Sequence, residues 1–227
     1  MSFCLQGRPG SITGYIGLMG GKNTVISRSS AASTAFRIPD VAAGGALRLI
    51  GISVRNGSTS GLGGGIQNAG TLLLNKVVLS GNTAGNGGGL ANLTGATANV
   101  IQTVFDGNTT TGVGGGGIIN SGSLALLGSS FSGNTAPING GALNTQATGT
   151  SRIVQSVFER NVSGGLGGGI SNLGTTSLDG TLVRLNRGSG GGGIATGNNN
   201  VTLSMSIVSN NIPDNCSPLN TIRGCVN

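Results

Sequence analysis

The chain has 227 residues, of which 47 are glycine and only 7% are charged, and its mean hydropathy is +0.19. Disordered glycine-rich linkers are polar, so this composition excludes one and indicates a buried core. The chain has no tryptophan or histidine and one tyrosine, so valine, isoleucine and leucine must fill that core. The net charge of +7 comes from singly scattered basic residues, which argues against nucleic-acid binding and favours a mild attraction to acidic polysaccharide or an anionic surface.

Residues 1–39 differ from the rest of the chain because they lack the glycine-rich turn described below. Met1–Gly10 is the expected N-terminal cap, and residues 11–39 are expected to form an irregular first rung. Short β-rich runs predict strands over residues 23–27 and 35–38. A capped end is expected because an open solenoid end would expose its core and its edge strands.

From residue 40 onward the chain repeats one phrase, a Gly-Gly-Gly-Ile-like turn followed by an apolar anchor residue with asparagine three places later. The turns are Gly63–Ile66, Gly87–Leu90, Gly115–Ile118, Gly140–Leu143, Gly167–Ile170 and Gly191–Ile194. The anchor and asparagine pairs are Leu79 and Asn82, Phe105 and Asn108, Phe131 and Asn134, Phe158 and Asn161, Val183 and Asn186, and Val208 and Asn211. A fixed period of this length is typical of a solenoid.

Successive anchors, starting from Val54, are 25 to 27 residues apart, and further apolar columns lie five and seven residues before each anchor. Apolar residues two apart indicate strands rather than helices. We therefore predict an all-β fold, a single-domain right-handed parallel β-helix of about eight rungs with 24–28 residues each, regular over residues 40–211. The asparagines are expected to form hydrogen-bonded ladders between rungs, and the glycine runs to supply positive φ.

The end of the chain holds two closely spaced cysteines, Cys216 and Cys225. We expect them to form a disulfide within a C-terminal cap over residues 212–227, which favours an oxidising compartment. Cys4 is left over, and without histidine it cannot belong to a Cys–His nucleophile pair.

These motifs resemble the repeats of secreted bacterial β-helix proteins and of chlamydial polymorphic outer-membrane proteins, which carry Gly-Gly-Ala-Ile and Phe-Xaa-Xaa-Asn. Gly140–Leu143 with Phe131–Asn134 is the nearest match, and residues 214–225 look like the closing segment of the secreted group. The resemblance covers about residues 40–227. It implies a surface, adhesive or secreted bacterial protein. The N-terminus shows no signal-peptide pattern, which leaves a cytoplasmic location as the alternative.

The outward positions on either side of each anchor are the places where function is expected. The column before the anchor is unusually apolar for a solvent face and predicts a binding face. The predicted binding face also includes Ser132 from the column after the anchor, and it comprises Val78, Val104, Ser132, Val157, Leu182 and Ile207. The alternatives are cover by a loop of the same chain or the ordinary preference of strands for β-branched residues.

The column after the anchor holds two acids, Asp106 and Glu159, two rungs apart with Ser132 between them. At ~4.8 Å per rung their separation is near the ~6.5–9.5 Å of an inverting glycosidase pair. Arg184 lies one rung beyond Glu159 and is expected to pair with it, which would weaken Glu159 as a general acid. These three residues are the candidate catalytic residues of a glycoside hydrolase.

The favoured function is a non-catalytic extracellular or cell-surface scaffold that is adhesive or binds carbohydrate, with polysaccharide or another protein as partner. The alternative is an enzyme, either a glycoside hydrolase, a polysaccharide lyase or an enzyme acting on a small molecule, with its site on the anchor strands. A lyase would need clustered oxygen ligands for Ca²⁺, and the five acids form no evident cluster. No cofactor, metal or nucleic acid is expected, and no stretch reaches the ~20 apolar residues of a membrane span.

Overall fold

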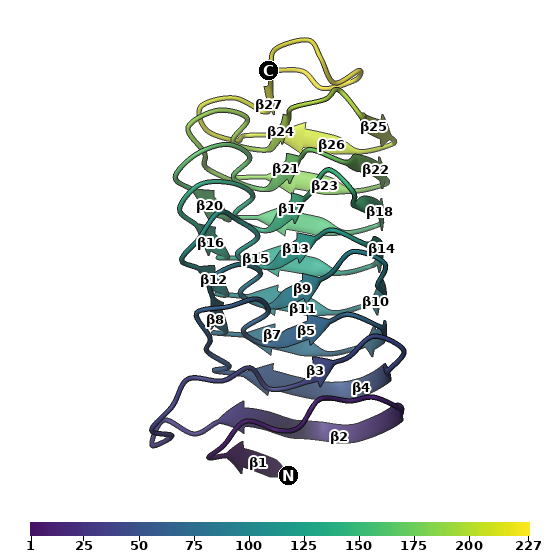
Figure 1. Cartoon of the computed structure of the whole chain (residues 1–227). Coiled ribbons are helices and arrows are strands. Elements are labelled where there is room, and N and C mark those ends of the chain that lie inside the picture. Colours follow the sequence, from purple (N-terminus) through teal and green to yellow (C-terminus); the bar gives the residue numbers. More distant parts are fainter.

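The computed structural model describes the backbone of residues 1–227 and every side chain except that of Lys22. It is an all-β parallel β-helix of about eight turns, which confirms the predicted fold class (Figure 1). The chain begins with β1 (Ser2–Leu5) and β2 (Tyr15–Arg28) at one end of the coil, and each following turn stacks on the one before.

Four columns of parallel strands run along the coil. The first column is β3 (Asp40–Val41), β5 (Ile66–Asn68), β9 (Leu90–Asn92), β13 (Ile118–Asn120), β17 (Leu143–Thr145), β21 (Ile170–Asn172), β24 (Ile194–Thr196) and β27 (Cys216–Ser217). The second is β4 (Ala46–Arg55), β6 (Thr71–Asn75), β10 (Thr97–Ile101), β14 (Ser123–Leu127), β18 (Thr150–Val154), β22 (Thr175–Asp179) and β25 (Val201–Ser204). The third is β7 (Val78–Ser80), β11 (Val104–Asp106), β15 (Ser130–Ser132), β19 (Val157–Glu159), β23 (Leu182–Arg184) and β26 (Ile207–Ser209). The fourth is β8 (Thr83–Ala84), β12 (Thr109–Thr110), β16 (Thr135–Ala136) and β20 (Val162–Ser163).

The chain changes direction where a residue adopts positive φ at the same place in every rung. One such column separates the second strands from the third strands: Gly51, Lys76, Gln102, Gly128, Gln155, Gly180 and Met205. Another follows the third strands: Asn56, Gly81, Gly107, Gly133, Arg160, Leu185 and Asn210. Because one residue in the left-handed region bends a strand sharply, these columns divide each rung into separate faces.

The Gly-Gly-Gly turns have two separate steric requirements. Each run supplies positive φ, as expected, but only at its first glycine, such as Gly63. The following glycines are needed because the backbones of adjacent rungs approach closely: a Cβ on Gly64 would collide with the carbonyls of Thr83 and Gly88. Glycine is therefore required there by close approach rather than by conformation.

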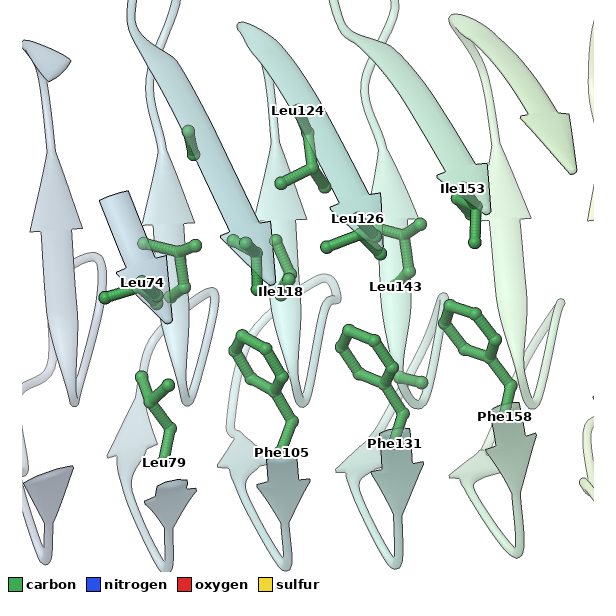
Figure 2. Packing of buried hydrophobic residues seen from close by; sticks show 14 of the residues in the cluster. Leu74, Leu79, Phe105, Ile118, Leu124, Leu126, Phe131, Leu143, Ile153 and Phe158 are labelled. Carbon is green, nitrogen blue, oxygen red and sulfur yellow. The ribbon is translucent and has the colours of Figure 1, made fainter. Parts of the chain in front are cut away.

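The core consists of side chains stacked on their counterparts in the next rung. The anchor residues from Val54 to Val183 and the aliphatic column from Leu49 to Leu178 are buried, as predicted. Phe105, Phe131 and Phe158 stack nearly parallel, with ring centroids 4.6 and 4.5 Å apart (Figure 2). This spacing follows the strand separation, so the pleat itself sets the ring contact.

The predicted asparagine ladder is present beside the anchors and is buried. Asn134 Nδ2 donates to Asn161 Oδ1 of the next rung at 2.9 Å and to the Phe105 carbonyl of the rung before at 2.9 Å. Its Oδ1 accepts hydrogen bonds from both nitrogens of Asn108. Each such amide therefore connects three successive rungs, and the ladder continues from Asn82 to Asn215.

A second, unpredicted asparagine ladder lies at the end of the first-column strands. Asn68 donates to Asn92 at 2.8 Å, and Asn92 donates to Asn120 at 2.9 Å. The pattern then changes because Thr145 replaces asparagine in the next rung, and Asn120 bonds to Ser151 instead. The two ladders connect successive rungs at both ends of the segment formed by the second-column and third-column strands.

The first rung is more regular than the sequence predicted. β2 pairs with β4 along most of its length, from Tyr15 opposite Ala46 to Ser27 opposite Arg55. Residues 35–38 are not a strand, which corrects the prediction; Phe36 and Ile38 are nevertheless buried against the core end. Their backbones form only isolated hydrogen bonds with the next rung. The two side chains therefore alternate inward, as in a strand, without continuous strand pairing.

The C-terminal end is closed by a short loop. Cys216 and Cys225 form a disulfide, and Cys216 pairs with Ile194 of the last complete rung. Asn215 accepts the last bond of the asparagine ladder. The buried ladder therefore finishes on a partner within this loop instead of leaving an unpaired amide.

Replacing Asn134 with alanine is expected to lower the free energy of unfolding by about 3 kcal/mol, because it leaves buried partners in two neighbouring rungs unpaired. Urea denaturation measures the loss. Asn99→Ala, at an exposed position on β10, is the matched control and should change stability by less than about 0.5 kcal/mol. Equal effects of the two substitutions would contradict a structural role for the ladder.

Replacing Leu185 with glycine is expected to raise the free energy of unfolding by about 0.5–1 kcal/mol. Leu185 has φ of 56° and is 42% exposed, whereas glycine occupies the equivalent place at Gly81, Gly107 and Gly133. Relief of left-handed strain exceeds the added entropy of the unfolded chain. Thermal and urea denaturation test this. Leu173→Gly, at an exposed residue of ordinary φ, should lower stability; a loss in both variants would refute the argument.

Candidate functional site

The candidate face consists of the outward side chains of β4, β7, β11, β15, β19, β23 and β26, here called the anchor face. These strands are adjacent and parallel in this order. Their pairing places Asp106 opposite Ser132, Ser132 opposite Glu159 and Glu159 opposite Arg184. The structure thus brings the predicted polar residues onto one straight line across the face.

The apolar column of the anchor face lies beside that line, in the register expected from the repeat. Val78, Val104, Val157 and Leu182 are half-buried, and Ser130 interrupts the column between Val104 and Val157. Ile207, on the last strand, is 62% exposed. None of these residues is fully buried beneath a loop, so the column contributes to an open, shallow surface.

The two acids of the anchor face are in different surroundings. Arg160 donates to Glu159 Oε1 at 2.8 Å, and Arg184 Nε donates to Glu159 Oε2 at 3.1 Å within an ion pair whose closest N···O distance is 2.9 Å. The pairing with Arg184 confirms the sequence prediction, whereas the contact with Arg160 was missed. Asp106 is exposed, and no described side chain forms a hydrogen bond or ion pair with it.

This arrangement does not bring two carboxylates together around a shared space. Both oxygens of Glu159 are engaged by guanidinium groups, so neither is free to approach a glycosidic oxygen. Ser132 lies between Glu159 and Asp106, one rung from each. Among the residues with described side chains, no three histidine, cysteine or acidic residues gather as metal ligands. The anchor face can therefore provide hydrogen bonds, charge and apolar contact.

Displaced pKa values occur elsewhere, at the N-terminal end of the coil. Burial tends to raise the pKa of Asp40, but hydrogen bonds from Ser11 and Arg8 and the charges of Arg37 and Arg8 outweigh it and lower this pKa. Burial lowers the pKa of Arg37, partly offset by Asp40. Asp40 also accepts a hydrogen bond from Gln67 at 3.0 Å, so this cluster joins the cap to the first regular rungs.

A groove of about 600 Å³ at the N-terminal end of the anchor face was not predicted from the sequence. Its lining comes from β2, β4, β7 and the bend before β7. It comprises Gly20, Gly21, Asn23, Thr24, Val25, Gly51, Ile52, Ser53, Arg55, Lys76 and Val78. A signal was present: Leu49 and Val54 are five residues apart, whereas their partners Leu18 and Ile26 are eight apart. The rung that contains β2 precedes Val54, the first anchor of the repeat, and has no Gly-Gly-Gly turn, so the period of the repeat does not predict its geometry.

Comparisons with models of known protein families, with curated proteins and with solved structures found no match to this chain. Within the described residues, no helix is long and apolar enough to cross a membrane. The fold and the geometry of the anchor face are therefore the basis for the functional argument.

Replacing Glu159 with glutamine is expected to lower the free energy of unfolding by less than about 1 kcal/mol, because its arginine partners are substantially exposed to solvent. The difference should shrink further in 1 M salt, where such pairs are screened. Urea denaturation at two salt concentrations measures both effects, with Asp106→Asn as the unpaired control. A loss of 3 kcal/mol would contradict the assignment of a surface ion pair.

Proposed function

We propose that the chain is a non-catalytic β-helix scaffold that acts outside the cell or at the cell surface, and that its anchor face binds an extended polysaccharide. The observation that carries the proposal is the row of adjacent parallel strands, on which a mainly apolar column lies beside a polar column. Such a face can repeat similar contacts with successive units of a polymer.

The two columns suit the two kinds of surface on a sugar. Val104, Val157 and Leu182 offer half-buried aliphatic groups to the C–H faces of a sugar ring, while Ser132 offers a hydroxyl to its polar edge. A site for a small molecule is normally a concave pocket that encloses its ligand. The open row of strands on the anchor face instead favours a long ligand that lies across many rungs.

An enzyme acting through Asp106 and Glu159 is less well supported. An inverting glycosidase needs one carboxyl group to donate a proton and the other to activate water, on opposite sides of the bond. Here the acids are on the same line of one open face, and Glu159 is occupied by Arg160 and Arg184. The geometry supports binding better than hydrolysis.

Two features support a location outside the cytoplasm. Disulfides persist mainly in oxidising compartments, and Cys216–Cys225 closes the C-terminal loop. The repeats also resemble those of secreted and surface β-helix proteins of bacteria, which supports an adhesive role. The glycine-rich rungs provide a rigid scaffold on which such a face could be displayed.

Binding to polysaccharides immobilised on an array, followed by calorimetry on the best ligand, tests the proposal. Val157→Asp should weaken binding at least tenfold, because it places a charge in the apolar column. Leu127→Asp is the matched control on the outward side of β14 and should leave the affinity unchanged. Equal affinities of the wild type and Val157→Asp, or no binding by the wild type, would refute the proposed function.

The enzymatic alternative is tested on the same ligands. The variant with Asp106→Asn and Glu159→Gln and the wild type are each incubated with the bound polysaccharide, and the products are separated by size. We expect no shortening of the polymer with either protein. Cleavage by the wild type that is lost in the double variant would establish the enzyme instead of the scaffold.

A further inference from the structure

The groove at the N-terminal end of the anchor face, here called the basic groove, has a clear structural origin. β2 and β4 pair in register up to Met19 and Ile50, and pairing resumes at Thr24 and Ile52. Residues 20–23 of β2 therefore oppose the single residue Gly51 and form a bulge. A bulge bends a strand and often lies beside a functional site. Here it builds a wall of the groove, to which Gly20, Gly21 and Asn23 contribute.

Among the described lining residues of the groove, two are cations and none is an acid. Arg55 comes from the end of β4, and Lys76 comes from the bend before β7. Neither forms an ion pair with any side chain that the structure describes, since the ion pairs involve Asp40 and Glu159. In the column of Arg55, the next rung carries Ser80 and the one after it carries Asp106. The positive charge of the groove is therefore locally uncompensated.

Neutral groups complete a surface suited to a charged sugar. Asn23, Thr24 and Ser53 place amide and hydroxyl groups in the lining, and none of these side chains forms a hydrogen bond with another described residue. Val25 and Val78 add apolar surface. Val78 is also the first valine of the apolar column, so the groove is continuous with the rest of the anchor face.

We infer that this groove binds the carboxylate or sulfate group of an acidic polysaccharide unit, with Arg55 and Lys76 as the residues that determine specificity. The inference rests on the proposed function for the polymer and adds the charge of its units. A guanidinium group matches the two oxygens of a carboxylate or sulfate, whereas an ammonium group attracts them as a point charge. A neutral sugar would leave both cations without a partner.

The chain itself supplies conservative variants for the test. Arg55→Ser introduces the residue found at Ser80 and Ser132 in the same column. Lys76→Gln introduces the residue found at Gln102 and Gln155, which have the same positive φ. Arg152→Ser is the control, because it removes one positive charge from an exposed position on β18, outside the groove. Serine is already present opposite it in the next rung, at Ser177.

The ligands are tetragalacturonate, its fully methyl-esterified form and a sulfated galactan tetrasaccharide, titrated by calorimetry and by NMR shifts of the Arg55 and Lys76 amides. We expect binding of tetragalacturonate or the sulfated ligand, at least tenfold weaker binding of the methyl ester, and shifts at both amides. Each groove variant should lose affinity at least tenfold, whereas Arg152→Ser should lose less than threefold. The ligand that binds more tightly, tetragalacturonate or the sulfated tetrasaccharide, identifies carboxylate or sulfate as the preferred group.

The outcomes separate this inference from the proposed function. Equal binding of the acid and its methyl ester, or unchanged binding in the double variant Arg55→Ser with Lys76→Gln, would overturn the acidic groove even if the anchor face binds a neutral polysaccharide. Binding of the short acidic ligands without retention of any long polysaccharide would support the groove and refute the extended face. Absence of binding by all of the ligands would overturn the inference.

Discussion

The constraint on which this structure depends is the stacking of like on like. In a parallel β-helix each inward side chain lies against its counterpart one strand spacing away, so a buried position must hold a residue that packs against the one stacked on it, which is often of the same type. Leucine, valine and phenylalanine meet this condition through apolar contact, as the Phe105, Phe131 and Phe158 stack shows. Asparagine meets it because one amide both donates and accepts, so Asn108 donates to Asn134, which in turn donates to Asn161. A buried carboxylate would repel its own copy, which agrees with the position of Glu159 on the outside.

The same constraint explains why the fold was readable from the sequence. Stacking forces chemically similar residues to recur at one period, and the two-residue spacing within a rung then separates inward from outward positions. The first-column ladder of Asn68, Asn92 and Asn120 was missed because it is short and ends where Thr145 replaces asparagine. Residues 35–38 were assigned to a strand because apolar alternation reports burial, and burial persisted at Phe36 and Ile38 without strand pairing.

The candidate site was less predictable because it departs from the repeat. Register alone placed Asp106, Ser132, Glu159 and Arg184 on one line, and the ion pair of Glu159 with Arg184 followed from that register. The contact with Arg160 did not follow, since its positive φ turns the chain immediately after β19 and the sequence does not show where the side chain then points. The groove depends on one bulge and on the pairing of a rung that has no glycine-rich turn. The repeat period predicts least about a rung that lacks the repeated turn.

The regularity of the anchor face has a consequence for the direction and position of a bound chain. The backbone of this face repeats from rung to rung, so its strand spacing alone offers a polymer several placements, each shifted by one rung. The bulge of β2 occurs once, at one end of the coil, so the groove with Arg55 and Lys76 breaks this translational symmetry. If the anchor face binds a polysaccharide as proposed, the regular rungs supply length and the single irregular rung supplies an origin from which the polymer is positioned.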